Sequence, residues 1–176
     1  MGDLSPHFDL REFKCGCGGS HEITIDAGLI DKLEKLYALM DAHAIIITSG
    51  FRCPEYSRSL PGGYFNDAHT KGIAADIMVM RNATGTPYYN SEDVAEAAER
   101  VGFTGIGIID GFAVHVDIRN AINYVNSHWF GDERTGNDNI ATFQRGTVFD
   151  GENVENGVDV TITINNNTYK GKVKKV

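Results

Sequence analysis

Residues 69–76 read HTKGIAAD, and residues 112–117 read FAVHVD. These two stretches decide the expected fold, because the first leads from a loop into a strand and the second reads as a strand. His69 and Asp76 lie seven positions apart, which does not match the three- or four-residue spacing of neighbours on one helix face. We therefore expect Gly72 to turn the chain between them.

The residue types in these stretches suggest a metal site. Alternate side chains of a strand point to one face, so His115 and Asp117 are expected to share a face. Two imidazoles and a carboxylate suit zinc, and three protein ligands leave a fourth position open for water, as in catalytic sites. His69, Asp76 and His115 are thus candidate ligands of one zinc ion, although such a spacing also occurs by chance.

Around these stretches the sequence predicts an α+β fold with a small, mainly antiparallel sheet. Apolar residues at helical spacing predict a helix over 26–42, with Asp26 as its N-cap, and a second helix over 91–101. The expected strands are 44–48, 73–80, 105–109 and 112–118. The first of them is an apolar run that we expect to be buried on both faces. Asp110-Gly111 favours a tight hairpin turn between the last two.

The remaining segments set the expected domain organisation. Residues 53–68 contain Pro54, Pro61 and two glycines, so we expect an irregular loop there, and a covering loop or short helix up to about residue 145. Alternation over residues 158–164 and a turn at Asn165–Asn167 predict a hairpin. We therefore expect a main domain over 1–145 and a C-terminal β-hairpin appendage over 146–176.

Composition narrows the class of protein. The 176 residues are 41% hydrophobic and 23% charged, which is typical of a folded soluble chain. The 16 basic and 24 acidic residues give a net charge of −8, which argues against a nucleic-acid partner. No apolar run approaches the roughly 18 residues of a membrane span, so no membrane insertion is expected. The N-terminus lacks the pattern of a secretion signal, so we expect a cytoplasmic start.

The three cysteines leave two interpretations open. Cys15-Gly16-Cys17 is too closely spaced for an easy mutual disulfide. We interpret these residues and Cys53 as reduced thiols, with a structural metal site as the alternative. His21, before the first helix, is expected to be solvated.

Five motifs occur in order along the chain. They are HFDLREF at 7–13, TSGFR at 48–52, HTKGIAAD at 69–76, GIG at 105–107 and VHVD at 114–117. Together they resemble the zinc D-Ala-D-Ala carboxypeptidase family, with its relatives among murein endopeptidases and phage endolysins. The resemblance runs from about residue 6 to residue 119, and it implies the fold that also underlies the hedgehog signalling domain.

The resemblance implies specific roles. His69, Asp76 and His115 would bind one zinc ion, and Arg52 would face the site and hold a carboxylate or carbonyl of the substrate. A guanidinium is always charged and can bind a carboxylate through two parallel hydrogen bonds; a surface ion pair is the alternative for Arg52. Tyr64, with the neighbouring Phe65, is a candidate substrate-binding wall, although packing would explain both equally well.

The chain departs from the family at the general base. Several branches place an acid three positions before the last zinc histidine, where this chain has Phe112. One branch places a histidine two positions before it, where this chain has Ala113. Neither side chain can move a proton. We therefore expect Asp117 to be the general base or the acceptor that orients a ligand. The alternative is a structural carboxylate that pairs with Arg119 or a backbone amide. Asp110 and Asp67 are reserve candidates.

The implied function is hydrolysis of a peptidoglycan stem peptide, at D-Ala-D-Ala or at an internal bond such as L-Ala-D-Glu. Since no secretion signal is visible, we expect a phage or prophage lysin that stays in the cytoplasm until its release onto the cell wall. One alternative is a non-catalytic zinc-containing cell-wall-binding module, which Phe112 and Ala113 favour. Another is a phage structural component that docks through residues 150–176. The oligomeric state is left open.

Overall fold

The computed structural model describes residues 2–81, 87–122, 128–145, 158–164 and 167–173. The chain divides into two compact units, Met1–Arg145 and Gly146–Val176, which are described separately. Among the described residues, no helix combines the length and the apolar character that crossing a membrane requires.

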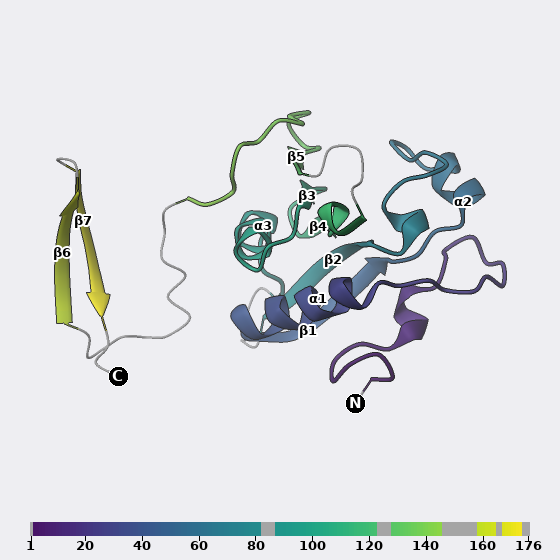
Figure 1. Cartoon of the computed structure of the whole chain (residues 1–176), viewed down its shortest axis with the longest axis horizontal. Coiled ribbons are helices and arrows are strands. Elements are labelled where there is room, and N and C mark those ends of the chain that lie inside the picture. Colours follow the sequence, from purple (N-terminus) through teal and green to yellow (C-terminus); the bar gives the residue numbers. More distant parts are fainter. Residues whose placement is uncertain (1, 82–86, 123–127, 146–157, 165–166, 174–176) are drawn as a thin grey trace. The chain divides into compact units, whose positions relative to one another are not determined.

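The first unit is built on a five-stranded sheet with the strand order β1-β2-β4-β3-β5 (Figure 1). Its strands are β1 (Ala42–Ser49), β2 (Ala74–Arg81), β3 (Gly105–Ile108), β4 (Ala113–Asp117) and β5 (Trp129–Asp132). The first four pair antiparallel, and β5 runs parallel to β3. The α+β class and the mainly antiparallel sheet expected from the sequence are confirmed.

Two helices cover one face of this sheet. α1 (Ala27–Leu39) packs on β1, α3 (Ser91–Arg100) packs on β3 and β4, and the helices also contact each other. α1 begins at the expected cap, since the Asp26 side chain accepts from the amide of Gly28. At the start of α3 the Asn90 side chain accepts from the amide of Asp93. The opposite face of β2 and β4 is therefore left for polar side chains.

The strand residues that face the helices form the core. They are apolar and almost fully buried: Ile77, Val79, Ile106, Ile108, Val114 and Val116. Against them lie Leu29, Leu33 and Leu36 of α1 and Val94, Ala97 and Ala98 of α3. Burial of this alternating set fixes which way β2 and β4 face, since side chains one position apart point to opposite sides.

Three details differ from expectation. The prediction that the first strand is buried on both faces is wrong, because the helices cover only one face and Ile46 is 37% exposed. The expected irregular loop contains the short helix α2 (Pro54–Ser59), which Pro54 starts at its first position. The covering segment contributes β5, whose four residues are too few to show a strand period.

The β3–β4 connection also differs from the expected tight turn. The amide of Ile109 donates to the carbonyl of Ala113 at 3.0 Å, so the connection spans more than the two residues Asp110 and Gly111. Asp110 Oδ1 accepts from the amides of Phe112 and Ala113, both at 2.7 Å. Gly111 does not have the left-handed φ that a two-residue turn of type I′ requires.

The N-terminal segment packs on the end of β1. It contains the 3-10 helix η1 (Leu10–Phe13), and the side chains of Phe8 and Phe13 are buried. The amide of Phe51 donates to the carbonyl of Phe13 at 2.9 Å. A Cβ atom on Gly50 would lie 2.5 Å from the Cα of Phe13, so the two backbones approach closely.

Two further 3-10 helices flank the strands. η2 (His69–Lys71) precedes β2, and η3 (Arg119–Ile122) follows β4. The second unit contains β6 (Val158–Ile164) and β7 (Asn167–Val173), which form the antiparallel hairpin expected from the alternating sequence.

Gly72 ends η2 and turns the chain into β2, as the sequence predicts. Its φ is +69°, in the left-handed region. Its carbonyl accepts from the amide of Asp26 at 2.8 Å, so the turn lies against the start of α1. A Cβ atom here would lie 2.1 Å from the carbonyl oxygen of Thr24, which leaves room only for glycine.

Gly72→Ala is therefore expected to lower the free energy of unfolding by about 2 kcal/mol or more. The alanine would have a strained left-handed φ, and its Cβ would collide with the carbonyl oxygen of Thr24. Gly111→Ala is the matched control: its Cβ would meet nothing within 4 Å, and its φ is not left-handed, so a change within about 0.5 kcal/mol is expected. Urea denaturation measures both. Similar losses in the two variants would contradict this account of Gly72.

Candidate metal centre

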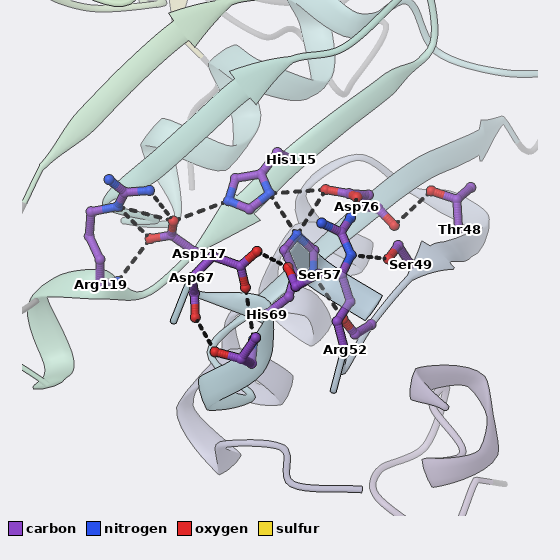
Figure 2. A network of polar contacts seen from close by, with 12 residues as sticks. Thr48, Ser49, Arg52, Ser57, Asp67, His69, Asp76, His115, Asp117 and Arg119 are labelled. Atoms are coloured by element: carbon purple, nitrogen blue, oxygen red, sulfur yellow. Dashed lines mark hydrogen bonds and ion pairs between the residues drawn. The ribbon is translucent and has the colours of Figure 1, made fainter. Parts of the chain in front are cut away.

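Three side chains from the sequence prediction converge beside β2 and β4 (Figure 2). His69 Nε2 lies 3.1 Å from His115 Nδ1 and 3.3 Å from Asp76 Oδ1, and the last two atoms lie 2.9 Å apart. We call these residues the metal triad. Since zinc bonds N and O ligands at 2.0–2.1 Å, tetrahedral coordination spaces ligand atoms by about 3.3 Å. The donor types and spacings of the triad therefore fit zinc.

The fold explains the convergence. Asp76 in β2 is the direct cross-strand partner of His115 in β4, so their side chains emerge together on the face opposite the helices. His69 starts η2, and Gly72 brings that turn back over the strand end. Two ligands thus come from a sheet register and the third from a turn.

Each histidine of the triad is held by its second ring nitrogen. His69 Nδ1 lies 2.8 Å from the carbonyl oxygen of Gly50, and His115 Nε2 lies 3.1 Å from Asp117 Oδ2. Both partners are acceptors, which favours a proton on these nitrogens and makes the opposite nitrogen the one available to a metal ion. This orientation is the one that a metal requires.

The electrostatics of the site favour a cation. Burial alone would raise the pKa of Asp76, but hydrogen bonds from His115 and His69 outweigh it and hold that pKa far below its usual range. Burial would lower the pKa of His115, but hydrogen bonds to Asp117 and Asp76 raise it to about 9. The two carboxylates thus stabilise a positive charge at this place. A divalent ion would replace the proton of His115 Nδ1 and leave a neutral imidazole beside it.

Asp117 lies behind His115 and is completely buried. Its Oδ1 accepts from the backbone amide of Arg119 at 2.9 Å, and its carboxylate forms an ion pair with the guanidinium of the same arginine. Burial would raise its pKa, but the hydrogen bonds from His115 and Arg119 hold it well below the usual value. The contact with His115 is that of an acceptor that orients a ligand, and the contacts with Arg119 are those of a structural carboxylate.

Arg52 lies on the other side of the triad. Its Nε donates to Ser49 Oγ at 2.9 Å, and its Nη2 forms an ion pair with Asp76 Oδ2. The side chain is 13% exposed, so it lies at the edge of the buried network. Its guanidinium carries five N–H groups, and these two bonds use two of them.

The other candidates lie in loops, before η2 and between β3 and β4. Tyr64 and Phe65, which precede His69, are 52% and 51% exposed. Asp67 accepts from the hydroxyl of Ser57 and from the amide of Thr70, so it organises its own loop. Asp110 accepts from the amides of Phe112 and Ala113 and so holds the β3–β4 turn.

Sequence reasoning missed the role of Trp129. Its ring meets His115 edge-on at 6.2 Å between centroids, and the Arg119 guanidinium lies 5.2 Å from the Trp129 ring centroid. A Cβ atom on Gly107 or Gly131 would lie 2.7 or 2.6 Å from this ring, so both glycines make room for it. Gly105 does the same for the Asp117 carboxylate, which a Cβ would approach to 2.1 Å. The G-x-G spacing was the available signal.

Comparison with known proteins gives one match. The sequence profile of the family described as Peptidase M15 matches residues 6–117, well over half of the 176-residue chain. The matched segment includes the metal triad, Arg52 and Asp117. Searches among curated proteins and among solved structures returned no match.

Proposed function

The chain belongs to the peptidase M15 family, and on this premise we propose that it hydrolyses a stem-peptide bond of peptidoglycan with one zinc ion at the metal triad. Peptidases of this family depend on zinc and act on peptidoglycan. The observation that carries the proposal is the convergence of the three donor atoms, each within 3.3 Å of the others, inside the matched segment.

In this proposal the chain's own residues fix the ligands before the metal arrives. The Gly50 carbonyl holds His69, the Asp117 carboxylate holds His115, and Arg52 holds the outer oxygen of Asp76. When bound, zinc supplies a Lewis acid that polarises the scissile carbonyl and lowers the pKa of a coordinated water. Because the ligands are held in advance, little reorganisation is needed on binding.

We assign Arg52 to substrate binding. Its guanidinium lies beside the triad, is partly exposed, and has N–H groups beyond the two used by Ser49 and Asp76. A carboxylate or carbonyl of the stem peptide held there would lie next to the metal. Tyr64, about half exposed on the loop before His69, is proposed as part of the substrate wall.

We assign Asp117 to orienting His115 rather than to accepting the proton of water. Its carboxylate is fully buried and is engaged by His115 and Arg119, so it acts on the reaction through the imidazole. As a general base it would have to face the reacting water directly.

The bond that is cut decides the biological setting. Cleavage at D-Ala-D-Ala trims the end of a stem peptide and leaves the wall intact. Cleavage of an internal bond such as L-Ala-D-Glu detaches cross-linked stems and solubilises the wall, as a phage or prophage lysin requires. We propose the lysin setting, and clearing of a purified cell-wall suspension distinguishes the two.

The zinc-loaded protein is expected to release new amino groups from purified peptidoglycan, and His115→Ala is expected to lower that rate at least about 100-fold, since it removes a ligand. His43→Ala is the matched control, because His43 is an exposed histidine on β1 outside the triad. Mass spectrometry of the products identifies the bond.

A non-catalytic zinc module is the second candidate, and Phe112 and Ala113 favour it because they stand where relatives carry an acid or a histidine. In that case both the unaltered protein and the His43→Ala protein would bind peptidoglycan without any product. The same assay therefore decides between the enzyme and the module.

Asp117→Asn is expected to weaken zinc binding about 10- to 100-fold, since a hydrogen-bond partner of a zinc histidine is altered. Competition with a chelator measures the affinity. Asp132→Asn is the control, because Asp132 is also buried and pairs with the arginine two positions later but has no contact with the triad. At saturating zinc, the Asp117→Asn protein should recover most of the turnover of the unaltered protein. A low turnover that saturating zinc does not restore would instead make Asp117 the general base.

Arg52→Lys is expected to lower kcat/KM about 10- to 100-fold, the equivalent of one charge-assisted hydrogen bond. The zinc content should stay unchanged, because lysine keeps a cation beside Asp76. Arg11→Lys, at an exposed position in η1, should leave kcat/KM unchanged. Full activity of Arg52→Lys would remove Arg52 from the substrate site.

A further inference from the structure

We propose that the first unit contains a second metal site, in which Cys15, Cys17, His21 and Cys53 bind a structural zinc ion. Each of these residues offers one ligand atom, and the four atoms lie within 4.8 Å of one another. Three thiolates and one imidazole form one of the recurrent ligand sets of structural zinc. We call these four residues the cysteine cluster.

The distances within the cysteine cluster suit a tetrahedral ion. Cys17 Sγ lies 3.0 Å from His21 Nε2. With Zn–S bonds of about 2.3 Å and Zn–N bonds of about 2.0 Å, tetrahedral ligands lie about 3.5–3.8 Å apart. The four atoms therefore need only small movements to reach a common ion, and the three cysteines form no disulfide.

Backbone amides already point at two of the sulfur atoms. The amide of Cys53 donates to Cys15 Sγ, and the amide of Gly19 donates to Cys17 Sγ, both at 3.3 Å. Such N–H groups stabilise the negative charge of a thiolate, which is the form that binds metal. The loop is thus arranged to hold anionic sulfur.

The glycines between the ligands allow the loop to close. Gly18 has a left-handed φ of +78°. A Cβ atom on Gly19 would lie 2.9 Å from His21 Nε2 and 3.4 Å from Cys17 Sγ, so a side chain there would push the imidazole away from the sulfur. On Gly16 a Cβ would lie 2.9 Å from the Tyr56 hydroxyl of α2. The three glycines therefore allow the four ligand atoms to lie close together.

The position of Cys53 indicates what the ion does. Cys53 caps α2 and directly follows Arg52, whereas the other three ligands lie in the N-terminal segment. An ion here would join that segment to the loop that carries the guanidinium beside the metal triad. Four protein ligands leave no open position, so this ion would stabilise structure and would not activate water.

The test is metal analysis of the reduced 176-residue chain purified in the presence of zinc. We expect two zinc ions per chain in the unaltered protein. The Cys17→Ser and His115→Ala proteins should each retain one, which separates the two sites. His43→Ala, the exposed-histidine control, should retain two. If Cys17→Ser does not fold, His21→Ala, also at an exposed position, takes its place.

Cobalt substitution gives an independent readout. The Co²⁺ protein should show thiolate-to-metal charge-transfer absorption that persists in His115→Ala and disappears in Cys17→Ser. A single zinc per chain that Cys17→Ser retains, or a Cys15–Cys53 disulfide in the purified protein, would overturn the proposal. Two ions in the unaltered protein without peptidoglycan hydrolysis would support the second site and would contradict only the proposed function.

Discussion

The pairing of Asp76 with His115 across β2 and β4 is the constraint on which the site depends. It places two ligand atoms 2.9 Å apart by sheet register alone. A shift of one residue in either strand would turn its ligand toward the helices and expose an apolar side chain such as Ile77 or Val114. The burial of the core therefore enforces the geometry of the metal triad, and site and fold are specified by the same alternation.

Alternating charge stabilises this pair within the fold. Figure 2 shows a continuous line from Arg52 through Asp76 and His115 to Asp117 and Arg119. Each buried carboxylate lies between an imidazole and a guanidinium, so neither is left unpaired. The arginines also balance the negative charge that makes the site attractive to a divalent ion. Loss of one member leaves its neighbour as a buried unpaired charge, and this is why the line acts as a unit.

The regular elements of the fold could be predicted from the sequence, whereas the exposure of β1 and the contacts of Trp129 could not. Helical spacing predicted both helices, with Asp26 as the cap of the first, and the ordered motifs pointed to the three residues that the fold brings together. The exposed face of β1 could not be predicted, because an apolar run does not reveal how many faces its neighbours cover. The role of Trp129 was hidden because it depends on a parallel pairing with β3, a contact between distant segments that no local period records.

The segment from Gly50 to Cys53 links the parts of the first unit that sequence reasoning treated separately. The Gly50 carbonyl orients His69, the Phe51 amide binds the N-terminal segment at Phe13, and the Arg52 guanidinium reaches Asp76. The Cys53 amide donates to Cys15. Four consecutive residues thus contact two triad ligands and two positions of the N-terminal segment. Because a displacement of this backbone would disturb His69 and Arg52 together, an anchor at Cys53 would have a direct physical connection to the metal triad.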